Sequence, residues 1–131
     1  MADYGMSIAL EISYEQAIEA VKEALKAEGF GVLTEIDMKT TLKKKLDADF
    51  RKYTILGVCN PPLAYKALQA ELQIGLLLPC NVIVYEDGNG SVVSAINPVS
   101  AMSVVDNTNL EPVAEQVRSK LKHALDSLKS K

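Results

Sequence analysis

The sequence predicts an α+β fold in which a mostly antiparallel sheet is covered on one face by two long helices. Two segments with apolar residues every three or four positions lie near the two ends of the chain, a pattern typical of amphipathic helices. Between them, short β-branched and apolar runs alternate with glycine, asparagine and proline, as strands and turns do. Because no repeat and no linker divides the 131 residues, we expect one domain spanning residues 1–131.

The first half of the chain predicts two strands and two helices. An apolar strand over 7–10 leads to Ser13 and Gln16, whose spacing has the form of a capping box and predicts that a helix begins there. A strand over 32–36 follows, and Asp37 caps a short helix. The apolar residues that define the two helices are Tyr14, Ile18, Val21 and Leu25 in the first and Met38, Leu42 and Leu46 in the second.

The second half predicts a hairpin between short and long helices. Gly88 and Gly90 supply the positive φ angles that a hairpin loop needs. Pro61 and Pro62 end the preceding strand, since neither can donate a hydrogen bond to a sheet. The expected elements are a strand over 53–59, a short helix over 63–72, strands over 82–85 and 92–96, an extended piece over 99–105, and a helix opening at residues 110–112.

Composition excludes several functional classes. The formal net charge is −3 and only 5% of residues are aromatic, which argues against nucleic acid as a partner. The longest apolar run, residues 74–85, is shorter than the roughly 20 residues of a membrane-spanning helix and contains Pro79. The N-terminal sequence lacks the pattern of a secretory signal peptide. We therefore expect a cytoplasmic protein without a membrane partner, with both cysteines as free thiols.

The net charge conceals alternating blocks. Residues 39–52 carry six bases and two acids, whereas residues 1–38 carry two bases and eight acids. The basic block has two interpretations: a solvated face of a short helix, or a binding site for a small anion such as a phosphate or carboxylate. In the second interpretation Lys43, Lys45 and Arg51 are the ligand-binding residues.

No catalytic set is recognisable, and no cofactor is indicated. His123 is the single histidine and belongs to the charged side of the last helix. A hydrolase or isomerase using acids near Asp37 and Asp49 with a lysine partner is a distant alternative, because solvated carboxylates explain these residues equally well.

The two cysteines occur in matched motifs. Cys59 and Cys80 are each followed by asparagine and flanked by proline, one at the end of a strand and the other at the start of the next. Antiparallel strands would place the thiols at one end of the sheet, and a parallel crossover would place them at opposite ends. Each cysteine is therefore either an inert buried thiol or half of a redox or soft-metal pair.

Three runs in order, over residues 29–46, 55–68 and 74–87, resemble the prokaryotic family known as domain of unknown function 302. The resemblance extends over nearly the whole chain. It implies a two-layer fold, similar to the TATA-binding-protein-like class, in which a curved antiparallel sheet carries two long helices. It also implies homodimers and the antiparallel topology that lets the thiols approach each other. It implies no activity, and the fold class does not carry DNA binding with it.

These observations lead to two main functional hypotheses. The first is a homodimeric module that binds a small ligand, whose anionic end the basic block would meet, or a protein partner, without catalysis. Asn60 and Asn81 are ligand-binding candidates in this hypothesis, unless their amides only tie down the chain at a strand end. The alternative is thiol-based redox or soft-metal handling through Cys59 and Cys80.

Overall fold

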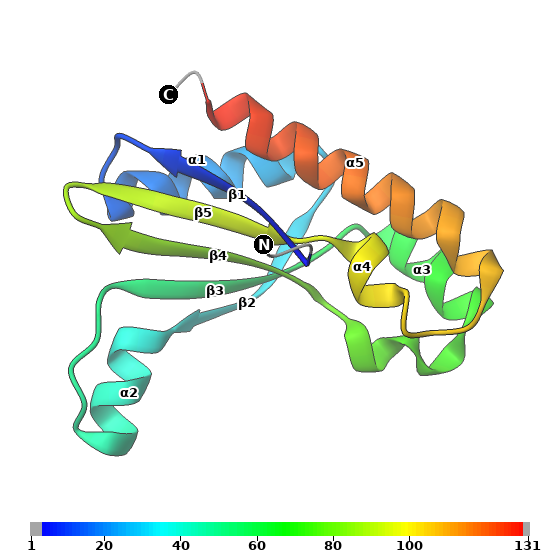
Figure 1. The fold of residues 1–131 in the computed structure, drawn as a ribbon, viewed down its shortest axis with the longest axis horizontal. Helices are drawn as coiled ribbons and strands as arrows, with labels where there is room; N and C mark the ends of the chain where they lie inside the picture. The colour runs from blue at the N-terminus through cyan, green and yellow to red at the C-terminus, as the bar shows by residue number, and fades with distance from the viewer. Residues whose placement is uncertain (1–3, 130–131) are drawn as a thin grey trace.

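The computed structural model describes residues 4–129, and the ends of the predicted 1–131 domain lie outside that range. Within it, five strands form one antiparallel sheet in the order β1-β5-β4-β3-β2 (Figure 1). The strands are β1 (Gly5–Leu10), β2 (Gly31–Asp37), β3 (Tyr53–Cys59), β4 (Cys80–Asp87) and β5 (Gly90–Ile96). The α-helices are α1 (Tyr14–Ala27), α2 (Met38–Leu46), α3 (Pro61–Ala70), α4 (Pro98–Met102) and α5 (Glu111–Leu128), with 3-10 turns η1 (Leu72–Leu77) and η2 (Thr108–Leu110).

Side-chain caps start the helices at the predicted places. The Ser13 side chain accepts from the Gln16 backbone N–H and the Gln16 side chain accepts from the Ser13 N–H, so the predicted capping box is confirmed. Asp37 caps α2 by accepting from the Thr40 N–H at 3.0 Å. These bonds satisfy backbone donors that a helix leaves free in its first turn.

The extended piece expected over 99–105 is wrong, because α4 occupies Pro98–Met102. The Asn97 side chain accepts from the Val99 backbone N–H at 3.1 Å, and Pro98 has a fixed φ that suits the first helical position. The β-branched residues of this stretch are too few to override that start signal. The helix expected over 63–72 begins two residues earlier and ends at Ala70, before η1.

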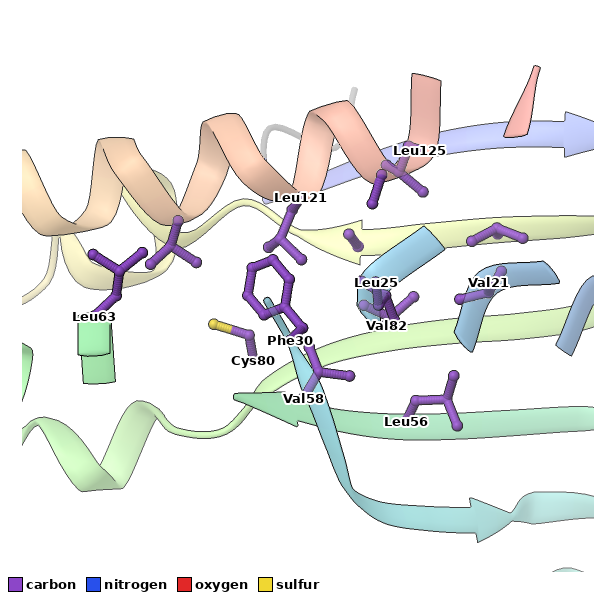
Figure 2. Close-up of a cluster of buried hydrophobic side chains, with 14 of the residues drawn as sticks. Val21, Leu25, Phe30, Leu56, Val58, Leu63, Cys80, Val82, Leu121 and Leu125 are labelled. Carbon is purple, nitrogen blue, oxygen red and sulfur yellow. The ribbon is translucent and has the colours of Figure 1, made fainter. Parts of the chain in front are cut away.

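The two long helices α1 and α5 pack on the same face of the sheet, as expected (Figure 1). The inner face of the sheet supplies fully buried side chains from its central strands, including Leu56, Val82 and Val93. These pack against Val21 of α1 and Leu121 of α5, both almost fully buried (Figure 2). The alternation of buried and half-buried positions along β4 and β5 shows that the core lies on this one face.

The other face of the sheet carries aromatic side chains from its central strands. Tyr53 and Tyr85 are opposite each other in the β3–β4 register, and their rings stack at 5.5 Å. Arg51 lies 5.7 Å above the Tyr85 ring, within the range of a cation–π contact. Apolar side chains beside these rings, such as Ile55 and Ile83, are half-buried.

The arm formed by β2 and α2 differs from the rest of the chain in its exposure to solvent. All seven residues of the edge strand β2 are exposed, and α2 has no buried residue. Figure 1 shows α2 lying beyond the β2 edge of the sheet, away from α1 and α5. Ion pairs anchor the base of this arm, with Lys22 of α1 bound to Glu35 of β2 at 2.8 Å.

Candidate functional site: an apolar pocket at the cysteine end of the sheet

Both cysteines lie at one end of the sheet. The antiparallel register pairs Cys80 with Val58, the neighbour of Cys59, and pairs Cys59 with Gly31 on the other side. This is the antiparallel arrangement, in which the two matched motifs meet at the same end of the sheet. Both cysteines are free thiols. Cys59 is the last residue of β3, where the chain turns into α3.

A pocket of about 300 Å³ opens between this end of the sheet, α3 and α5. Cys59 and Cys80 both line it, and Asn60 is its only lining residue with a polar side chain other than the two thiols. Ligand pockets of proteins begin at about this volume and are mostly apolar with a few polar groups. The apolar residues that line it are Phe30, Leu33, Val58, Leu63, Ala64, Ala67, Leu68, Leu78, Pro79, Met102, Val113 and Val117.

The Cys80 thiol is buried in apolar surroundings. Figure 2 shows its sulfur between Phe30 and Leu63, below α5. Burial, which disfavours the charged thiolate, and to a smaller extent the nearby Cys59 together raise the pKa of Cys80 to about 11. Because the thiolate is the nucleophilic form, Cys80 is a poor nucleophile at neutral pH.

Asn60, which lines this pocket, makes two structural hydrogen bonds. Its side-chain oxygen accepts from the Leu63 N–H at 3.4 Å, and its amide donates to the Glu28 carbonyl at 3.3 Å. Asn60 therefore ties the start of α3 to the end of α1, which is the chain-fastening role considered for it from the sequence. Asn81 is exposed and lines a separate hollow of about 260 Å³ together with Cys80.

The structure places the basic block at the other end of the sheet. The β2–β3 register runs from Gly31 opposite Cys59 to Asp37 opposite Thr54, about 20 Å along the strands, and α2 follows Asp37. The basic residues Lys43, Lys45 and Arg51 are thus not brought together with Asn60, Asn81 or the cysteines.

The basic block has a hollow of its own. This hollow, of about 430 Å³, is lined by Lys39, Lys43 and Lys44 together with Thr40, Ala48, Asp49 and Phe50. Lys43 is paired with Asp47 at 3.0 Å and Asp49 at 3.3 Å, so part of its charge is neutralised within the block. Lys45 is exposed on α2.

Among residues 4–129, the other chemistry-bearing side chains form no recognisable catalytic arrangement. Asp37 is the cap of α2 and Asp49 is paired with Lys43. The His123 side chain is 72% exposed and lies 3.9 Å from Glu28, on the charged side of α5 as expected. Within residues 4–129, no three His, Cys, Asp or Glu side chains are grouped so that they could hold a metal ion.

Sequence reasoning missed Met102. It lies in α4, is 6% exposed, and lines the pocket together with both cysteines. The signal that could have identified it is the Asn97–Pro98 pair, which repeats the Asn60–Pro61 start of α3 and predicts a helix rather than an extended piece.

The fold and the site define a two-layer α+β protein with an apolar pocket that two thiols line. The family model for the domain of unknown function DUF302 matches residues 6–128, and the chain belongs to this family. It is similar to the crystal structure of an uncharacterized conserved DUF302 protein from Bacillus stearothermophilus, at 29% identity and a TM-score of 0.90, covering 97% of this chain and 99% of that one.

Two further findings indicate no activity. No curated protein matches the chain. Among the helices of the described part of the chain, none combines the length and the apolar character that crossing a membrane requires.

Proposed function

We propose that this protein is a non-catalytic binding module whose pocket at the cysteine end takes a small, mainly apolar molecule. The observation that carries the proposal is the pocket itself, about 300 Å³ of space next to the core, lined by apolar side chains and open at the end of the sheet. Space of this kind costs stability if it serves no purpose, because its lining side chains lose packing contacts. A ligand would restore those contacts.

The pocket lining also indicates the charge of this ligand. It contains no Lys, Arg, Asp or Glu, and burying an unpaired charge there would be costly. The ligand of this pocket is therefore neutral, with one polar group near Asn60. We propose a separate anion site in the hollow at the other end of the sheet, where Lys39, Lys43 and Lys44 outnumber the one carboxylate of the lining, Asp49. Lys45 and Arg51 are nearby in sequence.

Titration with two probes of equal length tests the neutral-ligand proposal. We expect 1-octanol to shift the amide NMR signals of Cys59 and Ala64, and octanoate to shift them much less. Ala64→Phe, which fills the pocket, should abolish the octanol shifts, whereas Lys66→Phe on the exposed side of the same helix should not. Unchanged octanol shifts in Ala64→Phe, or no shifts at the pocket in the native protein, would contradict the proposal.

We also propose that the protein acts as a homodimer in the cytoplasm. The sheet face opposite α1 and α5 carries half-buried Tyr53, Tyr85, Ile55 and Ile83, and a second copy would cover them. The adjoining arm has both signs of charge, acidic on β2 and basic on α2, so that two copies related by a twofold axis could pair opposite charges. Free cysteines support a reducing compartment.

A second candidate function is soft-metal handling through Cys59 and Cys80. It is favoured by one observation, that both thiols line the same pocket. Redox catalysis is the weaker form of this candidate, since the raised pKa of Cys80 keeps that sulfur protonated at neutral pH. Anaerobic titration of the reduced protein with Cu(I) tests it, and binding that is unaffected by Cys59→Ala would contradict it.

A further inference from the structure

The hollow of the basic block has an aromatic wall beside its cationic ones. Phe50 lines it together with Lys39, Lys43 and Lys44, and the Phe50 side chain is 44% exposed. Its volume of about 430 Å³ lies within the range of small-molecule sites. From this combination we propose that the hollow binds a phosphate monoester that carries a planar aromatic ring, with the ring on Phe50 and the phosphate among the lysines. The inference rests on the proposed anion site and adds the chemical class of the anion.

The loop that follows α2 is fastened to this helix, which gives the hollow defined walls. The Lys39 side chain donates to the Phe50 carbonyl at 2.9 Å, and Lys43 is paired with Asp49 at 3.3 Å. At the end of the helix, the Asp47 N–H donates to the Lys43 carbonyl at 3.0 Å. These bonds hold Phe50 beside the lysines, so a ligand in the hollow can contact the ring and the ammonium groups together.

Two of the lysines retain their full charge for an anion. In the described part of the chain, neither Lys39 nor Lys44 is paired with a carboxylate. Lys39 uses one N–H on the Phe50 carbonyl and has further donors, because an ammonium group has three. Asp49, the carboxylate of the lining, is itself paired with Lys43. A phosphate monoester, with a charge of about −1.5 to −2 at neutral pH, uses two cations better than a carboxylate does.

Phe50 offers a surface that an inorganic anion would not use. Its ring centroid lies 6.0 Å from that of Tyr53, and Tyr53 in turn stacks on Tyr85. Phe50 is therefore the end of a row of rings, and it is the member of this row that lines the hollow. Contacts between aromatic rings add affinity beyond what buried apolar area alone provides. A ring on the ligand would extend the row while its phosphate stays among the lysines.

The test of the ring contact compares phenyl phosphate with cyclohexyl phosphate, which has the same charge and a similar size but no planar ring. Titration of the full chain, followed by the amide NMR signals of Thr40 and Phe50, gives both dissociation constants. We expect native protein to bind phenyl phosphate about 2–10-fold more tightly, the range for aromatic contacts beyond area burial. Phe50→Leu should abolish this preference, and the matched control Tyr65→Leu, at an exposed aromatic side chain of α3, should retain it.

Two lysine variants test whether the phosphate lies in the hollow. Lys44→Gln and Lys45→Gln remove the same charge from adjacent positions of α2, but Lys44 lines the hollow and Lys45 does not. Lys44→Gln should weaken phenyl phosphate binding about three- to fivefold, as the loss of an exposed ion pair does. Lys45→Gln should change it less than about twofold at 0.15 M salt, where charges without direct contact are largely screened.

The possible outcomes separate the inference from the anion site on which it rests. A preference for phenyl phosphate that is lost in Phe50→Leu and kept in Tyr65→Leu, together with weaker binding in Lys44→Gln alone, supports the aromatic phosphate site. Equal affinity for the two esters, or a preference that survives Phe50→Leu, overturns the ring contact and leaves the anion site standing if Lys44→Gln still weakens binding. Equal losses in Lys44→Gln and Lys45→Gln, or no binding of either ester, overturn both.

Discussion

Asn60 and Glu28 join the start of α3 to the end of α1. The Asn60 side-chain amide donates to the Glu28 carbonyl at 3.3 Å, and the Asn60 side-chain oxygen caps α3. The bond fixes the position of α3 relative to α1, and α3 forms one wall of the pocket. The position of this wall therefore depends on one nearly buried side chain, which is 8% exposed.

Asn60→Ala should destabilise the protein. It removes the helix cap and leaves the Glu28 carbonyl without this donor, which together cost about 1–2 kcal/mol in the free energy of unfolding. Asn60→Asp keeps an acceptor for the Leu63 N–H but loses the donor, so it should lie between the native protein and Asn60→Ala. Urea denaturation measures all three, and equal stability of Asn60→Ala and the native protein would exclude this fastening role.

Gly57→Ala should also destabilise the protein, because the strand pair leaves no room for a methyl group. A Cβ at this position would overlap the Thr34 hydroxyl and would lie 2.9 Å from the Pro79 ring. We expect a loss of about 1–3 kcal/mol in thermal or urea unfolding, the range for overpacking. Thr34→Ala removes one of the two obstacles, so the double variant should recover part of the loss; no recovery would place the strain elsewhere.

The raised pKa of Cys80 predicts a pH dependence of stability. The folded-state pKa of about 11 lies above the ordinary value of 9.0, so the folded protein disfavours the thiolate. The contribution of the protonated Cys80 thiol to the free energy of unfolding is complete below pH 9. It is lost as the pH rises toward 11, by about 2–3 kcal/mol in total. Tyrosines and lysines titrate in the same range, so the measurement is the difference between native protein and Cys80→Ala in urea at pH 7, 9 and 11. A difference that does not shrink with pH would contradict the prediction.

Ile83→Lys should produce a monomer if two copies meet on the helix-free face of the sheet. Ile83 is half-buried on this face, two residues before Tyr85 on β4 and opposite Ile55 of β3, and a lysine there would bury a charge in the proposed interface. Light scattering coupled to size-exclusion chromatography should show a dimer for the native protein and half that mass for Ile83→Lys, with unchanged circular dichroism. The control is Glu23→Lys on the exposed side of α1, which should remain a dimer.

The sequence predicted the elements that local chemistry determines. The capping box at Ser13, the Asp37 cap and the β4–β5 hairpin each depend on a few neighbouring residues, and each is found where expected. Of the two hairpin glycines, Gly88 has the expected positive φ, of 59°, and Gly90 does not. The extended piece expected over 99–105 is wrong, because the Asn97 side chain caps a helix that occupies Pro98–Met102.

The candidate site was only partly predictable. The family resemblance led to the antiparallel topology, and the topology places Cys59 and Cys80 at one end of the sheet. Met102 could not be found in this way, because α4 reaches the pocket through tertiary packing across about 20 residues of intervening chain from Cys80. The separation between the basic block and the cysteines was also not predictable from local motifs. It follows from the direction of the strands, which no local motif encodes.

The arm formed by β2 and α2 has a consequence for how the molecule opens. Because α2 buries no side chain, little of the cooperative free energy of the fold protects its backbone amides. In a single copy of the chain, hydrogen exchange should therefore reach α2 orders of magnitude sooner than the buried turns of α5, and trypsin should cut first within Lys43, Lys44 and Lys45. Protection of the α2 amides from hydrogen exchange in solution would thus show that another surface covers this helix.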